Sequence, residues 1–370
     1  IKVKKTIETT LCFVSFFFLN LAFWIYKNFP NVTFEQILYH LQWEQEGLLT
    51  ADSSLINSAI EQVLYCSIIG VLIIIFITLK KSIRYLYFFL FFIISFIILS
   101  HTIAFHHYII GRFGADYIAQ SYKPPIIAKY SNKKNLILIY VESLEKTYSE
   151  KKIFNKNYLE PLSMNSVYET SIPKFKQAYG TGWTIGGIVA SQCGIPLKAF
   201  GLTNGNEIHN STRHFLPNIK CLGDILRSNG YLNVFMGGAD HLFAGKGIFF
   251  KEHGYDEIYG KKEWQKLGQT SMNAWGLNDD SLLDNAYKKA IQLAQSSRPF
   301  NLTILTVNTH HPNGFLAPNC KINQPQNFLH VVDCTVKLLA QFVKKIKNNS
   351  ILKNSQIIIV GDHLAMQNTI

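Results

Sequence analysis

The sequence contains 370 residues, of which 48% are hydrophobic and 16% are charged, and Lys and Arg together outnumber Asp and Glu by 36 to 24. This apolar composition excludes an intrinsically disordered chain, a collagen-like repeat and a small disulfide-rich scaffold. The formal charge of +12 is compatible with nucleic-acid binding, but the basic residues are scattered and form no block or known recognition motif. We therefore expect no nucleic-acid partner.

Three stretches near the N-terminus are long and apolar enough to cross a bilayer, which takes ~20 residues per helix. They cover about residues 9–26, 62–79 and 85–105. Helices buried in a soluble core are the alternative, but the run Tyr85–Leu99 has no polar face. A signal peptide is the alternative for the first stretch, and the two further spans argue against it. These stretches predict a multi-pass membrane protein.

The position of the basic residues predicts the orientation of the spans. Lys2, Lys4 and Lys5 precede the first span, whereas the loop at 27–61 carries several acidic residues. The short link between the second and third spans is again basic, with Lys80, Lys81 and Arg84. Because basic flanks stay in the cytoplasm, everything after the third span is expected outside it.

The chain divides by composition into three parts. We expect a transmembrane region over residues 1–112, a linker over residues 113–134 that contains a Pro-Pro pair, and a globular domain over residues 135–370. The sequence begins without Met and stops a few residues after a dense polar cluster. We therefore expect both ends to be truncated and the globular domain to be incomplete at its C-terminus.

Four of the six cysteines fall in the globular domain, at Cys193, Cys221, Cys320 and Cys334. An oxidising compartment would allow three pairings of four thiols. We favour Cys193–Cys221 with Cys320–Cys334, because each bond closes a loop between neighbouring segments. Four free buried thiols remain an alternative, and zinc binding is a weaker one because no C-x-x-C spacing occurs.

Short β-branched and aromatic runs alternate with helical stretches in the globular domain. The strands are expected at 135–141, 232–236, 301–307 and 356–360, and the helices at 219–228, 281–297 and 332–348. Continuous apolar runs of this kind are typical of strands that are buried on both faces. The pattern predicts an α/β sandwich with a mainly parallel sheet.

Chemically similar residues follow each expected strand. The four strands run into Glu142, into Asp240 and His241, into His310 and His311, and into Asp362 and His363. Ligands bind at the carboxyl ends of parallel strands, where these side chains are expected to meet. Oxygen and imidazole ligands suit Mn, Mg or Zn. The alternative is a set of ordinary strand-end turns with core histidines.

A glycine-rich run at 180–187 precedes an expected helix. Thr184 stands where this helix begins, so its hydroxyl and the first free N–H groups can hold a phosphate. A simple helix cap is the alternative role for Thr184. Thr181 is the competing hydroxyl in the same run.

Several short motifs together carry a family resemblance. They cover residues 139–145, 182–184, 190–197, 222–226, 309–312 and 362–366. With them the chain resembles the bacterial phosphoglycerol transferases, above all those of type I that decorate osmoregulated periplasmic glucans, and more distantly the lipoteichoic acid synthases. The resemblance covers about residues 135–370. It implies an alkaline phosphatase/sulfatase-like domain in the periplasm, held by spans in the bacterial inner membrane.

The resemblance implies a role for individual residues. Thr184 would be the nucleophile, and one divalent cation, Mn or Mg in preference to Zn, would be bound by Glu142, Thr184, Asp362 and His363. Substrate contacts would come from His310, with His311 as second choice, and from Lys246, Trp183 and Asp240. Lipoteichoic acid synthases present a His and an Arg after the second strand, where this chain has Gly237 and Lys246. Lys246 would supply a point charge without the bidentate fork of Arg, and a solvated surface lysine is the alternative.

The implied function is a metal-dependent phosphotransferase. It would move glycerophosphate from phosphatidylglycerol to a periplasmic glucan or another envelope glycan through a covalent threonine intermediate, and release diacylglycerol at the bilayer. A phosphoethanolamine transferase is the nearest alternative, and a non-catalytic lipid- or glycan-binding protein is the second. A sulfatase is disfavoured because the run Cys193–Leu197 lacks the C-x-P-x-R pattern.

Overall fold

The computed structural model describes residues 2–29, 32–42, 53–78, 85–113, 122–126, 133–163, 170–172, 174–197, 215–323 and 325–365. The basic link at 80–84 and most of the linker expected at 113–134 lie outside the described residues. The chain forms two compact units, which are described separately. The first contains residues 1–38 and 48–116, and the second contains residues 39–47 and 117–370.

The first unit is helical. Its elements are α1 (Lys2–Asn28), the start of α2 (Phe34–Gln42), α4 (Ser53–Ala59), the π-helical η1 (Ile60–Tyr65), α5 (Cys66–Thr78), α6 (Tyr85–Thr102) and α7 (Phe105–Phe113). Within the described residues, three stretches are long and apolar enough to cross a membrane: Thr6–Asn28, Ile56–Ile77 and Tyr85–Thr102.

Contacts between the apolar helices are both aromatic and polar. The rings of Phe16 in α1 and Phe91 in α6 meet edge to face at 5.1 Å. Asn20 Nδ2 donates a hydrogen bond to Ser67 Oγ at 3.0 Å, which joins α1 to α5. Such polar contacts between small or amide side chains help to hold helices together in lipid, where the hydrophobic effect does not drive their association.

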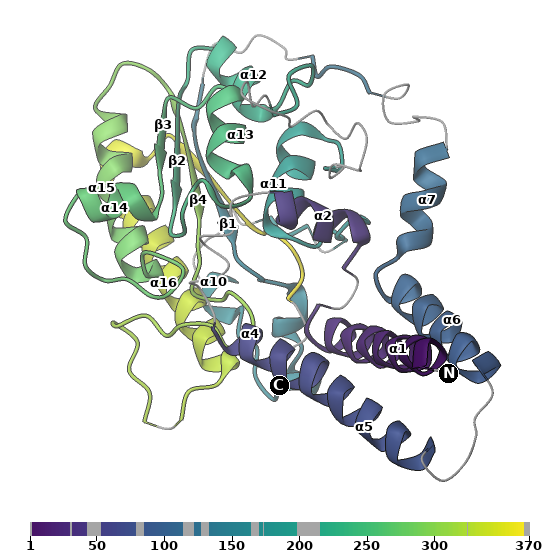
Figure 1. Ribbon diagram of the computed structural model, residues 1–370. Helices are drawn as coiled ribbons and strands as arrows, with labels where there is room; N and C mark the ends of the chain where they lie inside the picture. The colour runs from purple at the N-terminus through teal and green to yellow at the C-terminus, as the bar shows by residue number, and fades with distance from the viewer. Residues whose placement is uncertain are drawn as a thin grey trace. The chain divides into compact units, whose positions relative to one another are not determined.

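A five-stranded sheet forms the centre of the second unit (Figure 1). Its strands are β1 (Asn135–Val141), β2 (Leu232–Gly237), β3 (Glu257–Tyr259), β4 (Phe300–Leu305) and β5 (Ser355–Gly361). They lie in the order β3-β2-β4-β1-β5, and every pairing is parallel. The predicted α/β class with a mainly parallel sheet is confirmed. The sequence pattern missed β3, because it has three residues and begins with a charged one.

Helices cover both faces of the sheet (Figure 1). Besides the end of α2, the helices described in the second unit are α9 (Lys151–Phe154), α10 (Glu160–Ser163), α11 (Thr184–Cys193), α12 (Leu222–Ser228), α13 (Lys246–Glu252), α14 (Lys261–Lys266), α15 (Asp279–Ala294) and α16 (Phe328–Asn348). Short 3₁₀ turns occur at η2 (Lys146–Ser149), η3 (Phe243–Gly245) and η4 (Ser350–Leu352).

The side chains of β1 point alternately to the two faces of the sheet, so they join two different apolar clusters. Leu138 and Tyr140 join the apolar cluster that includes α11 and α13, whereas Ile137 and Ile139 join the cluster that includes α15 and α16. Successive side chains of a strand point to opposite faces. A strand covered on both sides must therefore be apolar throughout, which is why its sequence reads as a continuous hydrophobic run.

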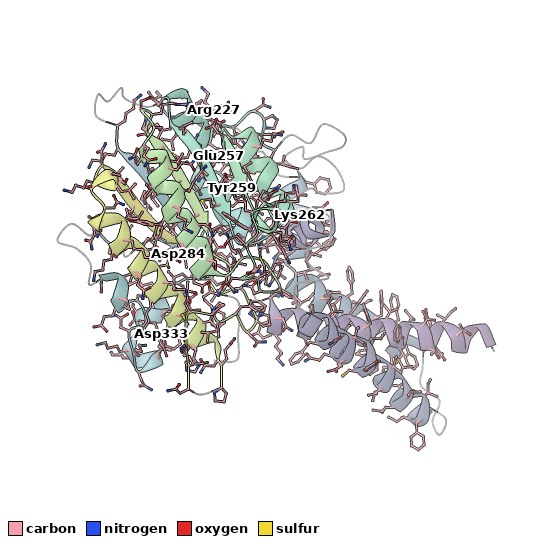
Figure 2. The ribbon with its side chains drawn as sticks, turned by 90° about the vertical axis from the view of Figure 1, so that its left-hand side faces the viewer. Arg227, Glu257, Tyr259, Lys262, Asp284 and Asp333 are labelled. Atoms are coloured by element: carbon pink, nitrogen blue, oxygen red, sulfur yellow. A yellow bond between two sulfur atoms is a disulfide. The ribbon has the colours of Figure 1, made fainter. Side chains whose placement is uncertain are left out.

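The outer faces of the second unit carry ion pairs (Figure 2). Asp284 of α15 lies 2.7 Å from Lys345 Nζ, and Glu257 of β3 lies 2.6 Å from Lys289 Nζ. The Asp284–Lys345 pair, in which both side chains are about half exposed, contributes little to stability. Charge on the short edge strand β3 does, however, disfavour its pairing with the edge of another sheet.

Candidate active site

Glu142 follows β1 directly and is buried. Its Oε1 accepts a hydrogen bond from Ser143 Oγ at 2.9 Å and lies 3.2 Å from His363 Nε2. Its Oε2 accepts one from Thr184 Oγ1 at 3.4 Å. The backbone N–H of Glu142 donates to Thr306 Oγ1 at 3.0 Å, just beyond the neighbouring strand β4. The carboxylate is therefore held at the carboxyl edge of the sheet.

Asp362 and His363 follow β5 and are buried as well. Asp362 Oδ1 accepts hydrogen bonds from the N–H groups of Ser143 (2.9 Å) and His363 (2.8 Å). His363 Nδ1 lies 2.7 Å from the carbonyl oxygen of Leu364, which assigns a proton to Nδ1 and turns Nε2 toward the carboxylates. The ligand atoms of Glu142, Asp362 and His363 lie within 4.8 Å of one another.

The charges in this cluster are strongly coupled. Burial raises the pKa of Glu142, but His363, His310 and two hydrogen bonds outweigh burial and hold that pKa well below its usual range. Burial and the charge of Glu142 raise the pKa of Asp362 to about 7. Burial lowers the pKa of His363, yet Asp362 and Glu142 raise it to about 10. Two buried carboxylates therefore require a positive charge between them.

The side chains of this cluster fit a divalent cation. Asp362 Oδ2 is buried and accepts no hydrogen bond from any described residue, and only His363 Nε2 stands beside it, at 3.5 Å. A buried carboxylate oxygen without a donor indicates a missing cationic partner. Two carboxylates, one imidazole and the nearby Thr184 hydroxyl form an oxygen-rich ligand set of the kind that divalent cations take.

Helix α11 presents Thr184 to this cluster. The residue before it, Trp183, has extended backbone angles (φ −160°, ψ 152°), so Thr184 is the first residue of the helix and not its cap. The competing Thr181 is buried and donates its hydroxyl to the carbonyl of Ala178 at 2.7 Å. Of the two hydroxyls predicted from sequence, Thr184 is the one beside Glu142.

A glycine allows α11 to approach β5 closely. A Cβ atom built on Gly187 would lie only 1.9 Å from the carbonyl oxygen of Asp362. The helix that carries Thr184 and the strand end that carries Asp362 therefore meet backbone to backbone. Gly187 thus has a packing role in the site that the glycine-rich motif alone does not reveal.

An aromatic and basic wall lies beside the cluster. His310 Nδ1 contacts the carbonyl of His311 at 2.8 Å, and its ring stacks on Trp275 with centroids 4.0 Å apart. Trp275 meets the ring of Phe243 at 5.6 Å, and Lys246 Nζ lies 4.8 Å from the centre of that ring. We call these four residues, His310, Trp275, Phe243 and Lys246, the aromatic–basic wall.

Lys246 is a buried residue and not a solvated lysine. It is 3% exposed, and its Nζ donates to the carbonyl of Phe243 at 2.8 Å. Burial lowers the pKa of Lys246 to about 8, against the opposing charges of Glu142, Asp240 and Asp362. Burial also lowers the pKa of His310, which favours its neutral form near pH 7.

The structure does not bring every predicted residue into the cluster. Asp240 Oδ2 lies 3.5 Å from Lys262 Nζ, and His241 Nε2 lies 3.2 Å from Glu263. Both therefore turn toward α14, because the chain after β2 folds back over that helix. Trp183 donates its indole N–H to the carbonyl of Gly180 at 2.9 Å, within the loop that leads to α11.

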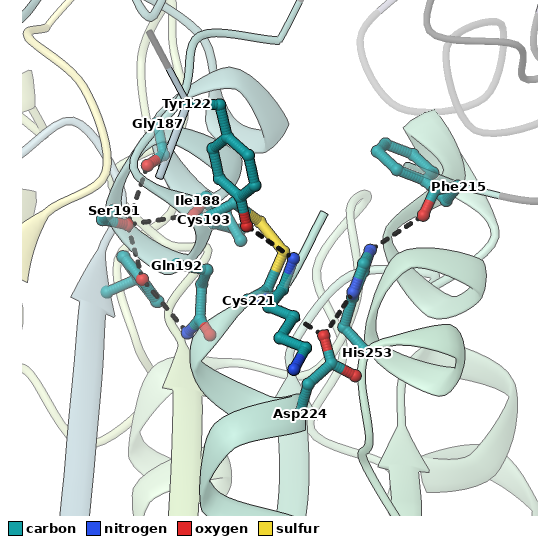
Figure 3. Close-up of a disulfide and its surroundings, with 12 residues drawn as sticks. Tyr122, Gly187, Ile188, Ser191, Gln192, Cys193, Phe215, Cys221, Asp224 and His253 are labelled. Carbon is teal, nitrogen blue, oxygen red and sulfur yellow. Dashed lines mark hydrogen bonds and ion pairs between the residues drawn. A yellow bond between two sulfur atoms is a disulfide. The ribbon is translucent and has the colours of Figure 1, made fainter. Parts of the chain in front are cut away.

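The globular-domain cysteines form two disulfides, Cys193–Cys221 and Cys320–Cys334, which is the pairing favoured from the sequence. Cys193 ends α11, and Cys221 precedes α12 (Figure 3). The first bond therefore fixes the end of α11 opposite Thr184. A second group of metal-ligand type among the described residues, Cys221 with Asp224 and His253, is not available to a metal, because the sulfur of Cys221 is in the disulfide.

Hydrogen bonds surround the Cys193–Cys221 bond (Figure 3). His253 Nδ1 contacts Asp224 Oδ2 at 2.8 Å, and its Nε2 contacts the carbonyl of Phe215 at 2.8 Å. Ser191 Oγ lies 2.6 Å from the hydroxyl of Tyr140, which joins α11 to β1. These contacts give α11 a fixed orientation on the sheet.

Sequence reasoning missed two aromatic residues near the site. Tyr39, which belongs to the second unit, is 0% exposed, donates its hydroxyl to the carbonyl of Ala244 at 2.8 Å, and packs edge to face on Trp183. Trp275 lies in a loop far from the strand ends in sequence. The sequence signal for Trp275 is the Asn-Ala-Trp-Gly stretch at 273–276, in which Asn and Gly are typical turn residues.

Residues 134–369 match the family model described as Sulfatase. The chain therefore belongs to the Sulfatase family, and it carries this α/β domain behind membrane-spanning helices. The expected membership of the alkaline phosphatase/sulfatase group is confirmed.

Two relatives carry the name phosphoglycerol transferase I. The protein from Escherichia fergusonii is 40% identical over 272 residues, which are 70% of this chain and 34% of the relative. The protein from Escherichia coli is 40% identical over 267 residues, with the same shares. The chain thus spans about a third of the length of these curated relatives.

Two solved structures share the fold. A protein of the alkaline phosphatase superfamily from Vibrio parahaemolyticus is 23% identical with a TM-score of 0.50, covering 64% of this chain and 56% of its own. The lipoteichoic acid synthase LtaP from Listeria monocytogenes is 20% identical with a TM-score of 0.50, covering 63% of this chain and 56% of its own. At sequence identities this low, the similarity to these two structures establishes a shared fold only.

Proposed function

We propose that this protein is a membrane-anchored phosphoglycerol transferase that takes glycerophosphate from phosphatidylglycerol. One observation carries the proposal: the hydroxyl of Thr184, at the start of α11, lies 3.4 Å from Glu142 in a buried cluster that fits a divalent cation. The relatives named phosphoglycerol transferase I support the choice of donor.

The reaction proceeds in two displacements. Thr184 Oγ1 gives up its proton as it bonds to the phosphorus of the donor lipid, and the bond from phosphorus to the diacylglycerol oxygen breaks; that oxygen takes up one proton in exchange, and diacylglycerol leaves. A glycan hydroxyl then gives up its proton as it bonds to the same phosphorus, the Thr184 ester bond breaks, and Thr184 Oγ1 regains a proton. We propose a periplasmic glucan, or another envelope glycan, as the acceptor.

Glu142, Asp362, His363 and Thr184 would hold one divalent cation, for which we propose Mn or Mg. When bound, such a cation lowers the pKa of a coordinated hydroxyl and offsets negative charge on the phosphoryl oxygens. The free N–H groups at the start of α11 face the same region and favour an anion there. His310 is held by its Nδ1 contact, which leaves Nε2 as a proton acceptor.

The spans would anchor the domain to the membrane that contains the proposed donor lipid. Three stretches that can cross a membrane would keep the domain beside the donor head group. We propose that the domain faces the periplasm of a bacterial inner membrane, as the basic residues before the first span and in the link at 80–84 predict.

The test uses the full chain in membranes, with phosphatidylglycerol labelled in its head group and Mn or Mg. We expect diacylglycerol release, and label transfer when linear β-glucan is added. Thr184→Ala should abolish release, whereas Thr181→Ala should retain it, because the Thr181 hydroxyl is bonded to Ala178 within its own loop. Release that survives in folded Thr184→Ala would exclude this nucleophile. Release only from phosphatidylethanolamine would identify the alternative transferase, and no release from either lipid would favour a binding protein.

A further inference from the structure

The aromatic–basic wall contains a tryptophan whose indole N–H has no hydrogen-bond partner among the described residues. Trp275 is 8% exposed, and its indole Nε1 has no hydrogen-bond partner among the described residues. A buried N–H group without an acceptor is uncommon in folded proteins, because burial removes the water that would otherwise bind it. Such a donor beside a proposed active site is a candidate contact for a bound ligand.

The indole is held in place from both sides. Its ring stacks on His310 at 4.0 Å, with 36° between the ring planes, and meets Phe243 edge to face at 5.6 Å. The backbone N–H of Trp275 donates to Asn273 Oδ1 at 2.9 Å, and Asn273 Nδ2 in turn contacts Asn308 Oδ1 at 3.2 Å. The loop that carries Trp275 is thereby tied to the end of β4, near His310.

Close packing fixes the same loop against β2. A Cβ atom on Gly276 would lie 2.0 Å from the carbonyl oxygen of Gly238. The N–H of Leu277 donates to that same carbonyl at 3.0 Å. The position of the indole is therefore set by backbone contacts and does not depend on a flexible surface turn.

The wall has two hydrogen-bond donors, the indole N–H of Trp275 and the ammonium of Lys246, and one acceptor, His310 Nε2. The indole of Trp275 only donates, and the ammonium of Lys246 donates and carries a positive charge. The nearby carboxylates are already engaged. Glu142 and Asp362 belong to the cation cluster, and Asp240 lies 3.5 Å from Lys262.

We propose that Trp275 binds the donor head group through its indole N–H and, with Lys246, selects glycerol over ethanolamine. This inference rests on the proposed function, and it adds the determinant of head-group choice. Glycerol hydroxyl oxygens accept hydrogen bonds from both residues. The ammonium of ethanolamine can only donate, and it would meet a second positive charge at Lys246, so the wall disfavours it.

The test separates hydrogen bonding from packing. Trp275→Phe retains a ring against His310 but removes the N–H. We expect kcat/KM for phosphatidylglycerol to fall about tenfold, as for a lost hydrogen bond that leaves a buried group unpaired. The rate with phosphatidylethanolamine should change little, so the preference between the two lipids should shrink by the same factor.

Trp264→Phe is the matched control. Its indole N–H is buried and donates to the carbonyl of Gly237 at 2.8 Å, so it is already partnered. That variant should lower the thermal midpoint and leave the lipid preference unchanged. If Trp275→Phe behaves in the same way, Trp275 only packs against His310 and the proposal is wrong.

A binding measurement distinguishes failure of this proposal from failure of the proposed function. Calorimetry on the full chain compares glycerol 1-phosphate with phosphoethanolamine, and we expect tighter binding of the former, lost in Trp275→Phe. This binding pattern without diacylglycerol release would support the contact and overturn the transfer reaction. Diacylglycerol release with no effect of Trp275→Phe would overturn the contact alone. Neither release nor binding would overturn both.

Discussion

Gly187→Ala tests whether close approach of α11 to β5 builds the site. The added methyl would lie 1.9 Å from the carbonyl oxygen of Asp362, whereas ordinary van der Waals contact begins at 3.4 Å. The neighbouring atoms are backbone and cannot rotate away. Helix α11 and the end of β5 must therefore separate by up to about 1.5 Å. This shift moves Thr184 away from Asp362.

The expected changes in free energy and rate predict that Gly187→Ala loses activity but still folds. Ala is better than Gly in a helix interior by about 1 kcal/mol, while inserting a methyl into a packed region costs about 1–3 kcal/mol. Net stability should therefore fall by no more than about 2 kcal/mol. Misplacing reactive groups by about 1 Å costs about 100-fold in rate. We expect kcat/KM for diacylglycerol release to fall by about this factor.

The assay measures diacylglycerol release from phosphatidylglycerol together with the thermal midpoint of each variant. Gly111→Ala is the matched control, because it makes the same change in α7, where nothing lies within 4 Å of the added Cβ. It should leave release unchanged. If folded Gly187→Ala retained kcat/KM within about threefold of the parent, a difference worth only about 0.65 kcal/mol, the packing argument would be refuted.

Three further predictions concern the cation, the lysine and the disulfide. Asp362→Asn should reduce the divalent metal bound per chain, measured by mass spectrometry after gel filtration; unchanged metal content would exclude Asp362 as a ligand. Because burial lowers the pKa of Lys246 to about 8, its ammonium is lost as pH rises through that value, so KM for the anionic donor should increase above pH 8. Lys246→Arg should flatten this rise, and a rise that persists in that variant would contradict the assignment. Replacing Cys193 and Cys221 together by Ser should lower unfolding free energy by about 3–4 kcal/mol for a loop with a sequence separation of 28, measured by denaturant titration; a change below about 1 kcal/mol would contradict that loop-entropy value.

Much of the cation cluster was predictable from one regularity. Parallel strands that are buried on both faces read as apolar runs, and the first polar residues after them meet at one edge of the sheet. This regularity predicts from the sequence that Glu142, Asp362 and His363 lie together. The same rule fails for Asp240 and His241, because the loop after β2 turns toward α14, and a strand-end position does not specify the direction of the following loop.

The sequence by itself determined the apolar spans, the parallel α/β class, the family motifs and the favoured cysteine pairs, because each depends on local pattern or on short separations along the chain. The tertiary structure alone decided which hydroxyl reaches Glu142, that Lys246 is buried, and that Trp275 stacks on His310. These facts depend on contacts between residues that are distant in sequence. Such contacts are set by how helices and loops pack on the sheet, and neither periodicity nor composition encodes that packing.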